Sequence, residues 1–221
     1  MKKLKIIFAM LALLPFFTVG SEEITTNGFI FSDYQKGKVY FKNNRVVESL
    51  FNYQTVTKQM LFRQNEQVLS LAYAQTTDSV VIGGRVFVYY QDNEFFEKIA
   101  LGKGNLFIQY SSVLLSKGKA AGYGGYSQLS STTSVNTISS LDGGQTSGFS
   151  HLSANEEFTA KTNLTFWIKR KDKFIKVNSQ SQVFKTFPEH KQAIQSYFID
   201  HKVNFGLLND VKVVLDYCFS L

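Results

Sequence analysis

The sequence KVYFKNNRVV, residues 38–47, decides the fold class because it has the pattern of a complete β-hairpin. Its first four residues include strand-forming Val, Tyr and Phe. Asn43 and Asn44 follow as a turn, and asparagine tolerates the positive φ that a two-residue hairpin loop requires. Residues 45–47 form the return strand. The stretch therefore predicts two neighbouring antiparallel strands.

The same pattern recurs on the C-terminal side of this hairpin, as short runs rich in Val, Ile, Phe and Tyr separated by Gly, Asn, Asp and Gln. No helix-length pattern intervenes, which argues against a parallel α/β sheet. Strands repeated about every ten residues favour an antiparallel meander that forms a sandwich or a curved, partly closed sheet. Further strands are expected at residues 58–63, 68–73, 79–82, 85–90, 95–101 and 106–115.

The composition changes over residues 116–154, where 21 of 39 residues are Gly, Ser or Thr. We expect most of this segment to be a loop. So long a loop is unusual inside a compact domain. It could instead be a mobile lid or insertion, or a pair of strands with weak patterning.

Strand character returns at residues 164–169 and 173–177, and helical patterns follow. Ser179 is expected to cap a helix that runs through Phe187. Pro188 suits the first turn of a second helix, and Asn209 is expected to cap the last one. The fold class is therefore α+β and mainly β. One mature domain, residues 21–221, would contain a β-rich part at 28–177 and a helical segment at 179–219.

Residues 1–20 have the layout of a signal peptide: Lys2, Lys3 and Lys5 precede an uncharged run at residues 6–19. Fourteen residues are short of the roughly 20 that span a bilayer. Small residues precede the expected cleavage after Gly20, and no cysteine lies nearby for lipid attachment. We expect an exported protein, periplasmic or extracellular and not a lipoprotein, with no transmembrane segment after cleavage.

Cleavage would also change the charge balance, because it removes three lysines and no acid. The net charge of +7 would fall to +4, with 21 basic and 17 acidic residues. Such a mild excess does not by itself indicate a polyanionic partner. Cys218, the single cysteine, cannot form an intrachain disulfide and is expected to be buried and inert.

No motif nominates a catalytic, cofactor-binding or metal-binding residue, so no cofactor is expected. Ser127 and Ser150 lie in segments that begin like a nucleophile elbow but lack its closing glycine. The acidic residues Asp92, Glu94 and Glu97 are expected on the solvated face of a hairpin. We therefore expect a protein that is not an enzyme, with a hydrolase of unrecognised site as a remote alternative.

The densest basic patch lies around the expected turn at 170–172 and is interleaved with Phe166, Trp167 and Phe174. Its basic residues are Lys169, Arg170, Lys171, Lys173 and Lys176. Cations beside aromatic rings can bind single-stranded nucleic acid, but export argues against nucleic acid. An anionic envelope glycan or a lipid head group is the more accessible partner; a charged hairpin with no ligand is the simpler explanation. The candidate contact residues are Trp167, Lys169, Arg170, Lys171 and Lys173.

Several short motifs resemble uncharacterised exported proteins of Bacteroidetes-type bacteria: residues 37–41, 51–53, 83–88 and 187–191, with Asn204-Phe205 and Asp210. The resemblance extends over most of the mature chain. It implies export and architecture, and it carries no activity. Asp78-Ser79-Val80 is also similar to sites that such bacteria O-glycosylate, which makes Ser79 a candidate for modification.

Together these observations predict a non-enzymatic exported protein that acts as a binding, adaptor or envelope-associated module. Its partner would be an envelope protein, a glycan or a lipid. The alternative is a carrier for a small apolar or lipid ligand, held in a cavity between curved strands and covered by the Gly/Ser-rich segment.

Overall fold

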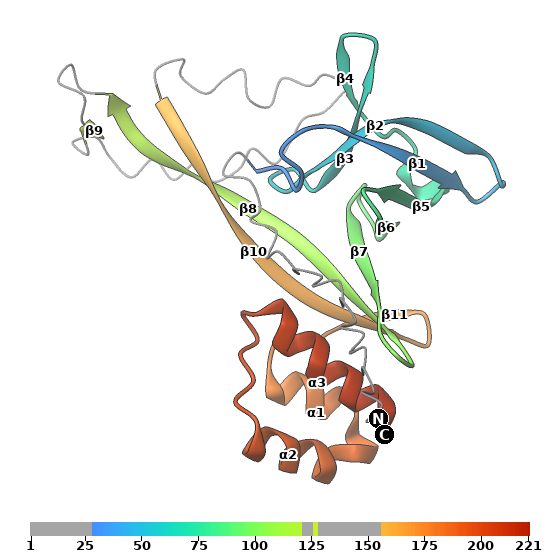
Figure 1. Ribbon diagram of the computed structural model, residues 1–221, viewed down its shortest axis with the longest axis vertical. Coiled ribbons are helices and arrows are strands. Elements are labelled where there is room, and N and C mark those ends of the chain that lie inside the picture. The colour runs from blue at the N-terminus through green and yellow to red at the C-terminus, as the bar shows by residue number, and fades with distance from the viewer. Residues whose placement is uncertain (1–27, 121–125, 128–155) are drawn as a thin grey trace, which may run out of the picture.

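The computed structural model describes residues 28–120, 126–127 and 156–221. The expected signal peptide at residues 1–20 and the candidate residue Ser150 lie outside the described residues. Within them the chain is mainly β, as expected: one antiparallel sheet is followed by a helical segment (Figure 1).

The sheet is one continuous, curved and open layer. Its strands are β1 (Gln35–Phe41), β2 (Val46–Gln54), β3 (Gln59–Gln64), β4 (Gln67–Ser70), β5 (Thr77–Ile82), β6 (Arg85–Tyr89), β7 (Phe95–Ala100), β8 (Asn105–Ala120), β9 (Tyr126–Ser127), β10 (Glu156–Arg170) and β11 (Lys173–Lys176). Their order is β11-β10-β8-β7-β6-β5-β1-β2-β3-β4, and β9 pairs with β8. After β4 the chain passes through a short 3-10 turn, η1 (Ala74–Thr76), and returns to the free side of β1.

Residues with positive φ form the tight turns. Asn44, with φ of 65°, turns the chain from β1 to β2 as the sequence predicts. Gly83 and Gly84 do the same between β5 and β6. Between β10 and β11 the two turn residues are Lys171 and Asp172, with φ of 47° and 64°, although neither is glycine.

Strands extend into the segment at 116–154 that we expected to be mostly loop; its residues 121–125 and 128–154 lie outside the described residues. β8 continues to Ala120, β10 begins at Glu156 rather than near residue 164, and β9 forms at residues 126–127. Polar residues occupy much of these extensions, which hides them in a search for apolar strands. Backbone pairing between β8 and β10 identifies them instead, over the register from Glu156 opposite Lys119 to Ile168 opposite Leu106.

The helices are α1 (Gln180–Thr186), the 3-10 turn η3 (Pro188–His190), α2 (Lys191–Asp200) and α3 (Leu208–Ser220). Ser179 caps α1 by accepting a hydrogen bond from the backbone N–H of Gln182 at 3.3 Å, as predicted. The prediction for Asn209 was wrong, because it lies inside α3. The side chain of Asp210 instead accepts a hydrogen bond from the N–H of Asn204 at 2.9 Å and so orders the entry to α3.

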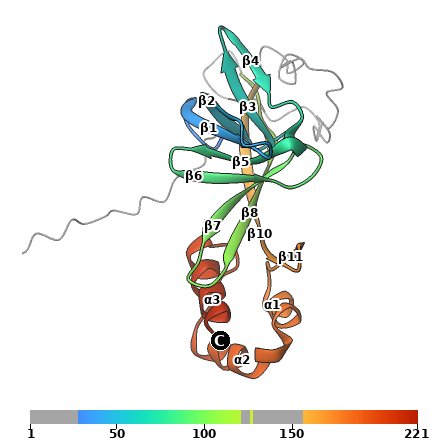
Figure 2. The same cartoon turned by 90° about the vertical axis from the view of Figure 1, so that its right-hand side faces the viewer.

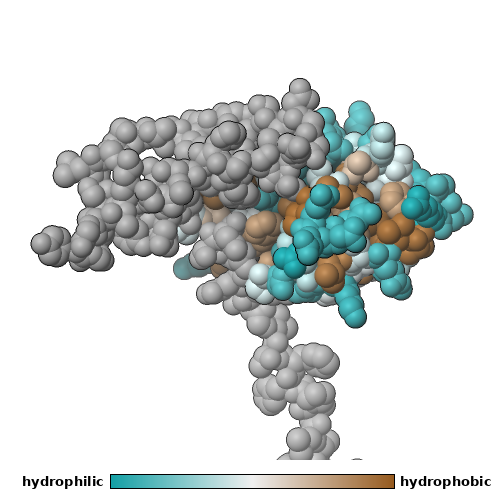
Figure 3. Space-filling model, turned by 90° about the horizontal axis from the view of Figure 1, so that it is seen from above, coloured by the Kyte–Doolittle hydropathy of each residue, from teal (hydrophilic) through white to brown (hydrophobic). Residues whose placement is uncertain are grey.

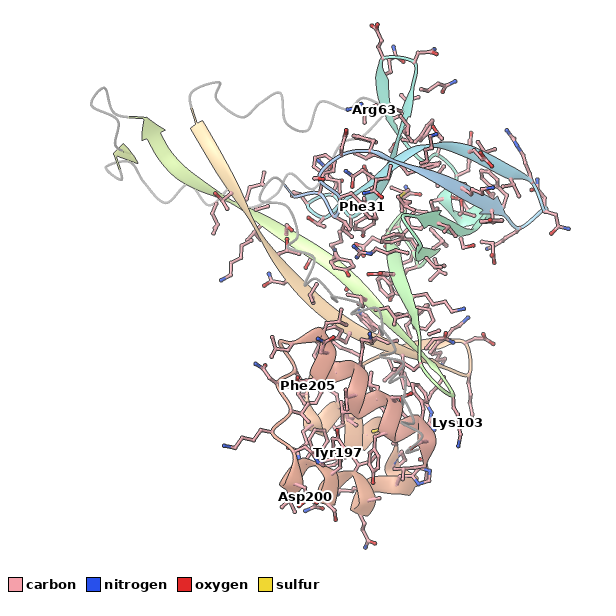
Figure 4. The ribbon with its side chains drawn as sticks, in the orientation of Figure 1. Phe31, Arg63, Lys103, Tyr197, Asp200 and Phe205 are labelled. Atoms are coloured by element: carbon pink, nitrogen blue, oxygen red, sulfur yellow. The ribbon has the colours of Figure 1, made fainter. Side chains whose placement is uncertain are left out.

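The helices pack at one end of the sheet, with α3 beside the β7–β8 turn and α1 beside β11 (Figure 2). The carboxylate of Asp216 accepts a hydrogen bond from the N–H of Gly102 at 2.8 Å. Lys103 donates to the carbonyl of Ser220 at the same end (Figure 4). Tyr197 of α2 stacks on Tyr217 of α3 at a centroid distance of 4.6 Å. None of the described helices is long and apolar enough to cross a bilayer.

A single hydrophobic core joins the sheet to the helices. In the sheet it contains large rings such as Phe51, Tyr53 and Phe87, all at most 1% exposed. In the helical segment the core contains Val183, Ile194 and the buried side chains of α3. Cys218 belongs to this core, and burial raises the pKa of its thiol to about 12, so the thiol is protonated at neutral pH.

The β10–β11 turn allows a direct test of the backbone geometry. Two consecutive residues with positive φ favour Asn followed by Gly. We expect Lys171→Asn with Asp172→Gly to stabilise the protein by about 1 kcal/mol. A β-branched residue is strained at positive φ, so Asp172→Val should destabilise it by a similar amount. Urea unfolding midpoints measure both variants; the opposite order would contradict the turn geometry.

Candidate functional site

The candidate basic patch lies on the β10–β11 hairpin, and the alternation of the strands divides it between two faces. Trp167 and Lys169 lie on one face, since Lys169 pairs across the strands with Phe174 and approaches its ring at 6.0 Å. Arg170 and Lys173 face each other on the opposite side. The structure therefore brings only part of the predicted set together.

Arg170 is engaged within the protein. Its guanidinium donates to the carboxylate of Glu189 at 2.7 Å and to the carbonyl of Thr186, and it lies 4.9 Å from the centre of the Phe187 ring. The same contact lowers the pKa of the Glu189 carboxyl. Arg170 thus anchors the helices to the hairpin.

Trp167 belongs to a set of five rings that we call the outer cluster: Tyr90, Phe96, Phe107, Trp167 and Phe174. Phe96 stacks on Tyr90 at 4.2 Å and on Trp167 at 5.6 Å. The edge of Phe107 meets Phe174 at 4.9 Å. Because neighbouring residues such as Phe95 and Ile108 belong to the main core, the outer cluster lies on the other face of the sheet.

The outer cluster is partly buried and partly open. Phe96 is 0% and Phe107 is 6% exposed, whereas the other three rings are half-buried. The indole N–H of Trp167 is buried and has no hydrogen-bond partner among the described residues. An unmade hydrogen bond at a buried donor costs about 1–3 kcal/mol. The cluster therefore offers ring surface, and the indole N–H lies beneath that surface.

Exposed lysines border these rings. Lys98 lies opposite Phe107 across the β7–β8 pair, and Lys176 lies opposite Trp167 across the β10–β11 pair. Lys169 makes an ion pair with Asp172 at 3.2 Å, but the carboxylate is 95% exposed, so this pair is weak. Lys171 stands at the turn. Together these side chains give the face a positive border.

Sequence analysis missed three of the five rings and one lysine of this face. The missed residues are Tyr90, Phe96, Phe107 and Lys98. They lie in expected strands, but they are far apart in the sequence and only the fold brings them together. A signal was present: in residues 85–90, 95–101 and 106–115 the positions that alternate with the core residues also carry rings. A strand that is aromatic on both faces has a second packing surface.

The core face of the sheet holds a buried ion pair, which corrects the expectation that Glu97 is solvated. The carboxylate of Glu97 is 8% exposed and accepts two hydrogen bonds from Arg85, at 2.8 and 2.7 Å. The hydroxyl of Tyr110 donates to the same carboxylate at 2.5 Å, and burial raises the pKa of that hydroxyl. The bidentate geometry and the extra donor compensate for desolvation.

A hollow of about 590 Å³ opens beside the β1–β2 turn. Its lining residues are Tyr40, Phe41, Lys42, Asn44, Arg45, Val46, Asp78 and Ser79. The hydroxyl of Ser79 lies 3.2 Å from the carboxylate of Asp78, to which it donates. Ser79 is half-buried here, and its glycosylation stays a prediction.

No three His, Cys, Asp or Glu side chains of the described residues come together as a potential metal site. Ser127 lies in β9, but the structure does not describe its side chain.

The buried ion pair predicts a large difference between two charge removals. Arg85→Met leaves the carboxylate of Glu97 buried without its cation, and we expect a loss of about 3–5 kcal/mol in the free energy of unfolding. Lys38→Met breaks an ion pair between two exposed side chains, Lys38 at 52% and Glu48 at 70% exposure, and should change the free energy of unfolding little. Denaturant unfolding compares the two; equal losses would contradict the buried role.

No protein-family model, no curated protein and no solved structure matches this sequence or this fold.

Proposed function

We propose that this chain is an exported, non-enzymatic binding module that recognises an anionic glycan of the cell envelope. The observation that carries the proposal is the outer cluster, where half-buried rings and an unpartnered indole N–H lie among exposed lysines. Flat aromatic surface suits the faces of sugar rings, and lysines suit carboxylate or sulfate groups.

A membrane surface fits this geometry less well than a glycan. Peripheral membrane binding uses apolar side chains that project into the lipid. Here the innermost rings, Phe96 and Phe107, are covered, and the tip of the hairpin carries Lys171 and Asp172. The rings therefore form a flat surface and do not project from the protein, which favours a ligand that lies across the face.

The first test uses Trp167 as its own reporter, because it is the only tryptophan of the chain. Oligogalacturonate, a polymer of uronic acid, should change its fluorescence on binding. Replacing Lys98, Lys169 and Lys176 by Gln should weaken binding about tenfold, since each exposed charge contributes up to about 1 kcal/mol. Added salt should weaken the binding of the parent protein.

The matched control removes three exposed lysines from the C-terminal helical segment: Lys185 in α1, Lys191 in α2 and Lys202 in the loop after α2, each replaced by Gln. This variant has the same net charge as the first and should bind like the parent. Equal loss in both variants would indicate a non-specific charge effect. Binding to anionic lipid vesicles or single-stranded DNA, without binding to the glycan, would replace the proposed ligand class.

Export is the second part of the proposal, supported by the lysines and the uncharged run in residues 1–20. The protein from its own host should begin at Ser21 and be found outside the cytoplasm, as N-terminal sequencing of fractionated cells would measure. Gly20→Phe should block cleavage, because signal peptidase accepts small residues at this position. A native protein that starts at Met1 inside the cell would contradict export.

A further inference from the structure

We infer that the hollow beside the β1–β2 turn is a second contact site for the same anionic glycan, so that the chain binds a polymer laid across its strands. This inference rests on the proposed function of the outer cluster.

The hollow contains the groups that an acidic sugar needs. Lys42 and Arg45 are exposed, and neither makes an ion pair with a described residue. The guanidinium of Arg45 lies 5.8 Å from the centre of the Phe41 ring, which holds it at the wall of the hollow. Tyr40 is 37% exposed and offers a ring.

Polar atoms complete the hollow. Asp78 and Ser79 lie on its β5 side and supply a carboxylate and a hydroxyl, which can bond to sugar hydroxyls. The hollow is therefore neither purely apolar nor purely basic. Two cations, one ring and two polar groups match the chemistry of a single uronic acid unit.

The register of the strands links the hollow to the outer cluster. Tyr40 of β1 lies opposite Ser79 of β5, and Ser79 lies opposite Val88 of β6. Val88 in turn lies opposite Phe96, which belongs to the outer cluster. These four residues form one row on one face of the sheet. Neighbouring strands are about 4.8 Å apart, so the row covers about 14 Å from Tyr40 to Phe96.

A second row runs beside the first and has lysines near its ends. Lys38 lies opposite Val81, Val81 opposite Val86, and Val86 opposite Lys98. Lys98 then lies opposite Phe107 of the outer cluster. Both valines are half-buried, so the middle of the face is apolar. Lys98 is exposed at one end, whereas Lys38 at the other end is paired with Glu48 at 2.8 Å.

This arrangement favours an extended ligand over a compact one. A single sugar could contact the hollow or the outer cluster but not both. A polymer that contacts one site brings its next units to the other at high effective concentration.

The end of the sheet that carries the β1–β2 turn, at the right of Figure 3, exposes hydrophobic side chains between hydrophilic ones.

The experiment measures affinity against ligand length. Oligogalacturonates of two to ten sugars are titrated into the mature protein, with Trp167 fluorescence and calorimetry as readouts. In the parent protein, affinity should rise about tenfold or more once the oligomer is long enough to contact both sites. Lys42→Gln with Arg45→Gln should remove this increase and leave the affinity for the disaccharide unchanged.

The matched control is Lys185→Gln with Lys191→Gln, which removes two exposed helix charges and should keep the increase. Affinity that does not depend on length, or a hollow variant that binds long oligomers like the parent, would overturn the second site and leave the outer cluster as the only one. Failure of every oligomer to bind would overturn the proposed function itself. Unchanged unfolding midpoints establish that the variants are folded.

Discussion

The core of the sheet depends on a contact between two strands that are not neighbours in it. Thr55, immediately after β2, accepts a hydrogen bond through its carbonyl from the N–H of Ser112 in β8 at 3.0 Å, and their hydroxyls lie 2.6 Å apart. This contact bends the open sheet until its two halves face each other. Tyr53 fills the space between them, stacked on Phe87 at 5.7 Å, with its hydroxyl donating to the carbonyl of Phe95.

Bending also determines what the outer face can be. Phe95 in β7 and Leu106 and Ile108 in β8 point to the concave, core side of the sheet. The residues next to them in each strand must therefore point to the outer face, because side chains alternate along a strand. In β7 and β8 these outward residues include Phe96 and Phe107, which no helix covers in the described part of the chain. They are buried instead by rings from β10 and β11. The outer cluster is thus a second, smaller core that remains open on one side.

Features set by local backbone chemistry could be predicted from the sequence. The Asn44 turn, the Ser179 cap and the position of Pro188 each follow from a residue and its immediate neighbours. The run of hairpins that they separate was predicted for the same reason.

Features set by distant partners could not be predicted. Burial of Glu97 requires Arg85 and Tyr110, and the engagement of Arg170 requires Glu189 on another element. Glu97 lies near other acids in the sequence, so we expected it to be solvated. Arg170 lies near lysines, so we expected it to be available to bind a ligand. The extensions of β8 and β10 were missed because each is stabilised by pairing with the other.

Arginines and lysines occupy different places in the structure, and this difference favours the proposed ligand with repeated charges. All four arginines lie over aromatic rings: Arg45, Arg63, Arg85 and Arg170. Arg85 and Arg170 also use their forked donors within the protein. The charged residues that border the outer cluster are lysines. A lysine ammonium is a point charge on a flexible side chain and lacks the rigid pair of donors of a guanidinium. Such a border places little constraint on the geometry of one anion, so the specificity of the proposed glycan site would come from several anions spaced along the ligand. Arg45 differs from the other three because it makes no ion pair with a described residue, and it lies at the hollow beside the β1–β2 turn.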